Sequence, residues 1–137
     1  MERLLLFPQP FADETLYSLV VRYHKLSANG SYRRTSQDLF GAYSRTCGSI
    51  VPCCLGALSQ RLASAYSVTE LIDRFTLLPL YEPFLSDATY SAACITMAGS
   101  DGTGLKMALG ITASGFLKYA SLRYCPSCVR EDTQHCG

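Results

Sequence analysis

The sequence has no tryptophan, few charged side chains and no apolar run long enough to cross a membrane. Charged residues make up 17% of the 137 residues and apolar residues 48%, a composition typical of a globular chain and unlike that of a disordered one. A membrane span needs about 20 apolar residues, whereas Pro8 and Pro10 break the run Leu4–Phe7. Asp13 and Glu14 follow without a small-residue cleavage site, which argues against a signal peptide. We therefore expect a cytoplasmic protein.

Signatures of common catalytic sites are also lacking. No phosphate-binding Gly-x-x-x-x-Gly-Lys-Ser/Thr occurs, and Gly102-Thr-Gly104 has neither the third glycine nor the preceding strand of a dinucleotide site. The carboxylates are scattered, so no cluster suits two-metal chemistry. His24 lies beside Lys25 without an obvious nucleophile, which favours a surface or interhelical role. We expect a protein that is not an enzyme.

Sustained alternation of apolar and polar residues is missing, so we expect few strands. Helical spacing recurs instead, first in Leu16, Leu19, Val20 and Tyr23. The sequence predicts that Asp13 caps this first helix, that Thr35 or Ser36 opens a second after a polar loop, and that Pro52 begins a third.

Further helix signals follow in the second half. Ser67-Val-Thr-Glu70 has the form of a capping box, and Ser86 or Asp87 can cap a helix that Gly99 closes. We expect residues 76–85 to form an irregular turn. The predicted fold is mostly α, a compact bundle of short helices with helix-turn-helix-like elements that ends at a zinc knuckle. Its predicted parts are an arm (1–12), a helical domain (13–120) and the start of a zinc-finger module (121–137).

The first half of the chain is mildly basic. Residues 1–68 hold seven basic and four acidic side chains, a net charge of +3, whereas residues 69–137 hold five and seven, a net charge of −2. Five of these basic residues are candidate contacts to DNA phosphates: Arg22, Lys25, Arg33, Arg34 and Arg45. An ordinary solvated face is the alternative.

The sharpest local motif is Cys125-Pro-Ser-Cys128. Two thiolates at this spacing can bind one tetrahedral zinc ion, because the intervening turn brings both sulfurs to the same side. Redox chemistry is an alternative, but a redox pair typically begins a helix within a βαβ pattern, which this sequence lacks. Unligated structural cysteines are a third interpretation.

A structural zinc ion requires four ligands, and within this chain only His135 and Cys136 follow the pair. These two residues are adjacent, which makes ligation by both awkward. We therefore expect an incomplete zinc site, with the second ligand pair beyond Gly137. Seven cysteines in a chain without an export signal indicate reduced thiols, and we expect four of them to be buried small hydrophobes: Cys47, Cys53, Cys54 and Cys94.

A series of short motifs occurs in one order over about 120 residues. The motifs are Phe7-Pro-x-Pro, Asp13-Glu14-x-Leu16-Tyr17-Ser18, Arg22-Tyr23-His24, Glu70-Leu71-Ile72, Thr76-Leu-x-Pro79-Leu-Tyr81-x-Pro83-Phe84, Leu109-Gly110-Ile111 with Ser114, and Leu122-Arg123-Tyr124-Cys125-Pro126-x-Cys128-Val129. Each motif alone is weak, but the ordered set is specific. Together they resemble the TniQ family of transposition target-selection proteins, which includes TnsD.

The resemblance implies an adaptor that selects insertion sites for a transposon. Such proteins bind target DNA directly or join a CRISPR guide complex, and they recruit the transposon's AAA+ regulator ATPase. The family combines helix-turn-helix-like elements with zinc fingers, in which a Cys-x-x-His pair usually follows the Cys-Pro-x-Cys. That pair is missing here. Pairing of two copies as a homodimer stays open.

In TnsD-like members the N-terminal arm contacts the ATPase, and the matching positions here run from Phe7 to Ser18. The implied partner-binding residues are Phe7, Pro8, Pro10, Phe11, Leu16 and Tyr17. The large apolar groups of residues 4–7 and Phe11 suit either folding back on the core or docking on a partner. Two other functions stay open: a purely structural helical domain whose DNA contacts lie in downstream modules, and a Cys-x-x-Cys redox protein.

Overall fold

The computed structural model describes residues 3–42, 51–111 and 125–136. In these three stretches the chain forms helices and no strand, which confirms the mostly helical prediction. The elements are α1 (Leu16–Leu26), α2 (Tyr32–Phe40), α3 (Leu55–Arg61), α4 (Val68–Phe75), the 3₁₀ helix η1 (Leu78–Phe84), α5 (Asp87–Ala98), α6 (Leu105–Ala108) and α7 (Pro126–Cys136).

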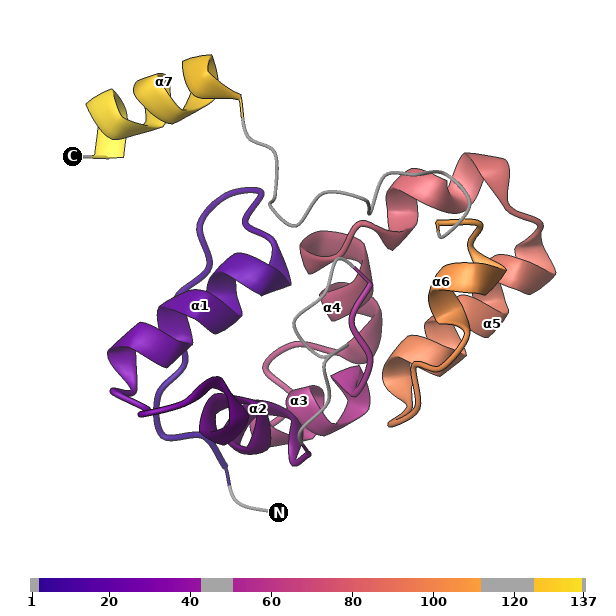
Figure 1. The fold of residues 1–137 in the computed structure, drawn as a ribbon, viewed down its shortest axis with the longest axis horizontal. Coiled ribbons are helices and arrows are strands. Elements are labelled where there is room, and N and C mark those ends of the chain that lie inside the picture. The colour runs from indigo at the N-terminus through magenta and orange to yellow at the C-terminus, as the bar shows by residue number, and fades with distance from the viewer. Residues whose placement is uncertain (1–2, 43–50, 112–124, 137) are drawn as a thin grey trace.

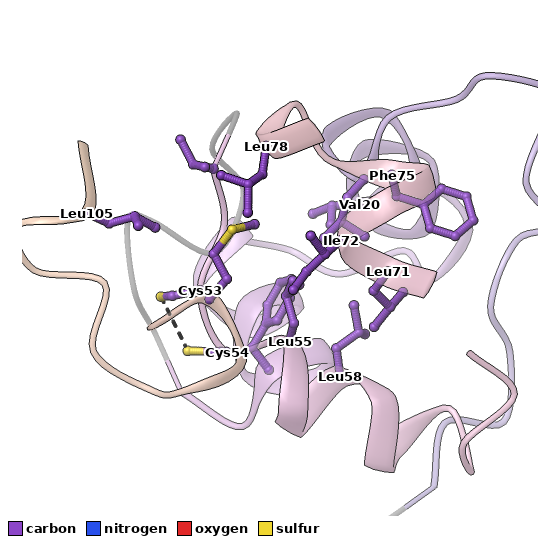
Figure 2. Packing of buried hydrophobic residues seen from close by; sticks show 14 of the residues in the cluster. Val20, Cys53, Cys54, Leu55, Leu58, Leu71, Ile72, Phe75, Leu78 and Leu105 are labelled. Atoms are coloured by element: carbon purple, nitrogen blue, oxygen red, sulfur yellow. Dashed lines mark hydrogen bonds between the residues drawn. The ribbon is translucent and has the colours of Figure 1, made fainter. Parts of the chain in front are cut away.

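Helices α1 to α4 surround the main core, α5 and α6 lie side by side at one end, and α7 stands apart from the bundle (Figure 1). Leu55 and Leu58 on α3 face Leu71 and Ile72 on α4 across the core (Figure 2). The largest fully buried side chains are almost all aliphatic. This burial of apolar surface is the main force that holds such short helices together.

Several helix boundaries lie where the sequence predicts them. The Ser67 hydroxyl accepts the Glu70 backbone N–H at 3.1 Å, and the Glu70 carboxylate accepts the Ser67 N–H at 2.8 Å, so the capping box is present. Ser86 caps α5 by accepting the Thr89 N–H at 3.2 Å, and Gly99 follows its last turn. Gly41 ends α2 in the left-handed conformation that glycine adopts without strain.

The first two helices begin elsewhere than predicted. Thr15, not Asp13, caps α1, with its hydroxyl 3.4 Å from the Ser18 N–H. Helix α2 starts at Tyr32, because the Ser31 hydroxyl accepts the Arg34 N–H at 3.3 Å. The predicted polar loop over residues 31–34 is therefore the cap and first turn of a helix. Several hydroxyl or carboxyl side chains adjoin each start, and the tertiary fold decides which of them caps the helix.

Helix α3 also starts later than predicted, at Leu55 rather than Pro52. Cys54 precedes it with a left-handed φ of 66°, and its backbone N–H donates to Gly99 O at 2.7 Å. This bond pins residues 51–54 to the end of α5, so they cannot continue α3 toward its N-terminus. Residues 78–84, predicted as irregular, form η1.

The ends of the described chain differ in how they pack. Residues 3–12 lie along the bundle, whereas the side chains of 125–135 on and before α7 are exposed. The predicted domain boundary near 120 lies outside the described residues. No helix in the described part of the chain has the length and apolar character that a membrane span requires.

Candidate partner and nucleic-acid surfaces

The N-terminal arm, residues 3–12, is fastened to the bundle. The Leu4 N–H donates to Arg61 O at the end of α3 at 3.0 Å. Leu4 and Phe7 pack against the core, Pro8 is buried, and the Phe7 ring lies 6.3 Å from the Tyr23 ring on α1. Part of the arm thus folds back on the core, one of the two arrangements expected from its apolar residues.

Glu14 joins the arm to α1. This residue is 8% exposed, and its carboxylate accepts the Phe11 N–H at 3.0 Å, the Ser18 hydroxyl at 2.7 Å and Arg22 Nη1 at 2.6 Å. Glu14, Ser18 and Arg22 are spaced four residues apart, so they fall on one side of the helical segment. A buried carboxylate needs such a set of donors, because an unpaired charge is costly away from water.

Arg22 therefore has an internal role in this structure. Besides the ion pair with Glu14, its guanidinium donates to Gln9 O at 3.1 Å and lies 4.0 Å above the Phe11 ring. These contacts hold the arm against α1. The charge of Arg22 is matched by the buried Glu14 carboxylate, so less of that charge is available to a phosphate, and its contact with DNA stays a prediction.

The arm also exposes large apolar side chains. Leu5 is fully exposed, Leu6 is 53% exposed and Phe11 64%, and we call these three the apolar arm residues. Of the predicted partner-binding residues, Tyr17 is also exposed, whereas Pro8 and Leu16 are buried in the bundle. Pro10 and Phe7 are half-buried. A partner can reach Phe11 and Tyr17, but not Leu16.

Three of the other predicted phosphate contacts lie where α1 ends and α2 begins. Lys25 is in the last turn of α1, and Arg33 and Arg34 are in the first turn of α2. All three side chains are exposed, and we call them the basic corner. Arg34 forms an ion pair with Asp38 one turn later, at 3.1 Å. Arg45 lies outside the described residues.

A polar network fixes the geometry of this corner. The Thr35 hydroxyl, fully buried, lies 2.8 Å from His24 Nδ1 on α1 and accepts Asn29 Nδ2 at 3.1 Å. Asn29 also donates to Asp38 at 2.9 Å. The His24 ring stacks on Tyr32 with centroids 4.3 Å apart. His24 is thus an interhelical residue, one of the two roles expected for it.

The cysteine pair lies at the start of α7. Cys125 precedes the helix and Cys128 is in its first turn, and both are exposed. The Cys128 N–H, the Cys128 thiol and the Ser127 N–H donate hydrogen bonds to the Cys125 sulfur and lower the pKa of the Cys125 thiol. The same thiol–thiol bond raises the pKa of Cys128. The two sulfurs therefore lie on the same side of the helix start.

The structure does not bring His135 to this pair, and the backbone of Cys136 follows His135 in the last turn of α7. They lie at the opposite end of α7, and seven residues of helix place His135 about 10 Å along the axis from Cys128. Among the described residues, no three His, Cys, Asp or Glu side chains gather in a way that could hold a metal ion.

The remaining cysteines lie in the bundle. Cys53 and Cys54 are buried, as predicted, with their sulfurs 3.6 Å apart (Figure 2). Cys94 is half-buried beside a hollow of about 470 Å³ that Asp73, Glu82 and Tyr90 also line. Burial, followed by the nearby Asp73, raises the pKa of the Cys94 thiol, which favours the unreactive protonated form. Cys47 lies outside the described residues.

Comparison with known proteins identifies the family. The TniQ family profile matches residues 5–137, nearly the whole chain. The chain belongs to the TniQ family. It is also 29% identical over 125 residues to the transposon Tn7 transposition protein TnsD of Escherichia coli, a match that covers 90% of this chain and 25% of TnsD. This TniQ chain therefore spans about a quarter of the length of that relative.

The structure gives physical roles to the motifs that carry the TniQ resemblance. Glu14, Ser18 and Arg22 form the contacts between arm and helix. The Thr76 hydroxyl donates to Ile72 O at 2.7 Å and accepts the Leu78 N–H at 3.3 Å, so it ends α4 and starts η1. Leu109 and Ile111 belong to the core.

Three contributors to these surfaces, Glu14, Thr35 and Asn29, were not identified as site residues from the sequence. Glu14 is predicted there only as part of a motif, and Thr35 only as a possible helix start. One signal was present: Glu14, Ser18 and Arg22 share a spacing of four residues. That spacing is typical of polar pairs along one helix face. The contacts to Gln9 and Phe11 have no comparable sequence signal.

Proposed function

We propose that this TniQ-family chain acts as a target-selection adaptor in DNA transposition and not as an enzyme. In this role it links target DNA, or a CRISPR guide complex, to the transposon's AAA+ regulator ATPase. The observation that carries the proposal is the family match over residues 5–137, supported by the similarity to a Tn7 transposition protein. The structure adds two groups of exposed side chains, the apolar arm residues and the basic corner.

The apolar surface is our proposed contact for the ATPase. Leu5, Leu6 and Phe11 are exposed on an arm whose backbone is fastened to the bundle. Large apolar groups held in water favour association, because burying each of them in an interface releases hydration water. Tyr17 lies on the first turn of α1 and extends the same proposed contact.

The basic corner is our proposed contact for nucleic acid. Lys25, Arg33 and Arg34 flank the junction of α1 and α2, and the first turn of α2 adds backbone N–H groups that favour a phosphate. We propose that α1, the connection 27–31 and α2 form the helix-turn-helix-like element expected of the family. Tyr32, exposed and stacked on His24, stands at the same junction.

Zinc binding by Cys125 and Cys128 is a further part of the proposal. Two cysteines at this spacing can supply one edge of a zinc tetrahedron, and both lie exposed at the start of α7. Zinc would supply structural crosslinking there. Stoichiometric zinc in the purified protein, with thiols inert to oxidants, supports this role, whereas a metal-free pair that cycles between thiol and disulfide supports redox chemistry.

One observation favours a purely structural domain as the second candidate. Arg22 and Arg34 both form ion pairs with carboxylates of this chain, Arg22 with Glu14 and Arg34 with Asp38. These pairs reduce the charge that is available for phosphates. In that case the DNA contacts lie in modules other than this one.

Charge reversal separates the two candidates. We expect Arg33→Glu with Arg34→Glu to weaken binding to a DNA duplex and to lower the slope of log affinity against log salt by about two, since each phosphate contact contributes about one. The matched control reverses Arg74 on α4 and Arg130 on α7, the same change in net charge at exposed positions elsewhere. An unchanged salt slope in the corner variant would favour the purely structural domain.

Partner recruitment is tested with the cognate AAA+ ATPase. We expect Leu5→Ser with Leu6→Ser to reduce its capture at least tenfold, about 1.4 kcal/mol, through loss of apolar contact area. Ile95→Ser with Met107→Ser is the control, because both side chains are 74% exposed on α5 and α6. If both double variants capture the ATPase like the wild type, the arm is not its contact.

A further inference from the structure

The buried carboxylate of Glu14 accepts hydrogen bonds from one residue of the arm and from two residues of α1. One oxygen accepts the Phe11 N–H and Arg22 Nη1, and the other accepts the Ser18 hydroxyl. We infer that Glu14 is a positioning residue for partner docking: its carboxylate fixes the arm in the conformation that the partner recognises. This inference rests on the proposed function of the arm.

The geometry indicates that the carboxylate acts on the arm through Arg22 as well as directly. The ion pair with Glu14 holds the Arg22 guanidinium, which in turn donates to Gln9 O at 3.1 Å and lies 4.0 Å above the Phe11 ring. Residues 9 and 11 of the arm are therefore both fastened to α1 by contacts that depend on Glu14. The Phe11 side chain nevertheless stays 64% exposed.

A fastened but exposed apolar group has a specific consequence for binding. A free arm loses conformational entropy when a partner orders it, and this loss reduces affinity. In this chain the Phe11 backbone is already ordered by its bond to Glu14, and the ring is supported from one side by Arg22. Binding that buries the free side of the ring therefore avoids the entropic cost of ordering the Phe11 backbone.

The partner is a protein surface with an apolar recess. The apolar arm residues Leu5, Leu6 and Phe11 carry no charge of their own, and the one guanidinium beside Phe11 is matched by Glu14. A nucleic acid would instead need unmatched cations or donors at this position. The exposed basic side chains of the basic corner lie elsewhere, where α1 ends and α2 begins.

The test uses the full chain and two substitutions of similar size. Glu14→Gln removes the charge that holds Arg22 and places an amide donor beside that guanidinium. Glu70→Gln is the matched control. The Glu70 carboxylate also accepts a hydrogen bond from the backbone N–H of the residue three positions earlier, but it belongs to the α4 capping box and not to the arm. The control weakens the fold locally without touching the arm. Ser18→Ala is a milder second variant, should Glu14→Gln not fold.

Two readouts decide the outcome. We expect Glu14→Gln to speed hydrogen exchange of the Phe11 amide and to reduce affinity for the cognate AAA+ ATPase, each by about tenfold or more, and Glu70→Gln to change neither. Unchanged exchange at Phe11, or unchanged affinity despite faster exchange, overturns the positioning role while the proposed function stands. Failure of the wild-type chain to bind the ATPase overturns the proposed function of the arm, and the positioning role with it.

Discussion

Glu14 and Glu70 each accept a backbone N–H from the residue three positions earlier, yet their surroundings make them do different things. Glu14 is buried and shared with Arg22 and Ser18, so its carboxylate organises contacts between the arm and α1. Glu70 is exposed, and in the described part of the chain the hydrogen bonds to its carboxylate all come from Ser67. The first residue acts on tertiary structure and the second on one helix start.

The Glu70 capping box predicts a dependence of stability on pH. The Ser67 backbone N–H, followed by the Ser67 hydroxyl, holds the pKa of Glu70 below its ordinary value of 4.5. Because the folded pKa is the lower one, the carboxylate stabilises the folded state above pH 4.5, and this stabilisation is lost as the pH falls through the folded pKa.

We therefore expect Glu70→Gln to lower the urea midpoint at neutral pH, and the difference from wild type to disappear in acid below the folded pKa. Urea unfolding of both proteins at a series of pH values measures this difference in midpoint. Glu82→Gln, at an exposed site on η1, is the control. A difference between Glu70→Gln and wild type that stayed constant from neutral to acid pH would contradict the assignment.

At the scale of elements, the approach of α3 to α5 is limited by a glycine. A Cβ atom added to Gly56 on α3 would lie 2.8 Å from the backbone oxygen of Ala98 at the end of α5. The Cys54 N–H bonds to Gly99 O in the same region. The two helices therefore meet backbone to backbone, and the contact leaves no room for a side chain at residue 56.

This contact reverses the usual effect of replacing a helical glycine. Alanine is ordinarily favoured over glycine within a helix by about 1 kcal/mol. We expect Gly56→Ala to destabilise the protein instead, by about 1–3 kcal/mol, because α3 or α5 must shift. Gly30→Ala meets nothing within 4 Å and should leave the chemical-denaturation midpoint almost unchanged. A stabilised Gly56→Ala protein would show that the two helices separate easily.

At the scale of the whole molecule, one continuous core supports surfaces of different chemistry. The arm and the basic corner lie at the α1–α2 side of the bundle, and α5 with α6 at the other (Figure 1). Leu58 on α3 is fully buried beside α4, whereas Ile95 on α5 is largely exposed. The orientation of both proposed contact surfaces thus depends on packing between α1, α2, α3 and α4.

Shortening a core side chain should therefore destabilise the whole molecule and not only one of its surfaces. We expect Leu58→Ala to cost about 2–5 kcal/mol of unfolding free energy, and Ile95→Ala to change it by about 0.5 kcal/mol or less. Unfolding followed separately by circular dichroism and by tyrosine fluorescence measures both variants. Noncoincident transitions for Leu58→Ala would indicate that α5 and α6 unfold independently of the main core.

The sequence determined those features that depend on residues three or four positions apart. The Ser67–Glu70 capping box, the Ser86 cap and the Gly99 end of α5 were all predicted, and so was the apolar face of α1. Such features form within a single helical turn, so their pattern is local. The ordered TniQ motifs were likewise readable from the sequence, and the family match bears them out.

Only the tertiary structure decided the partners of residues far apart in the chain. Arg22 has the charge expected of a DNA contact, but folding of the arm onto α1 places its guanidinium against Gln9 and Phe11. The start of α3 was set by a bond from Cys54 to Gly99, 45 residues later. Side-chain charge and helical spacing indicate which kinds of interaction a residue can form. The packing of segments far apart in the chain determines the partner with which it forms them.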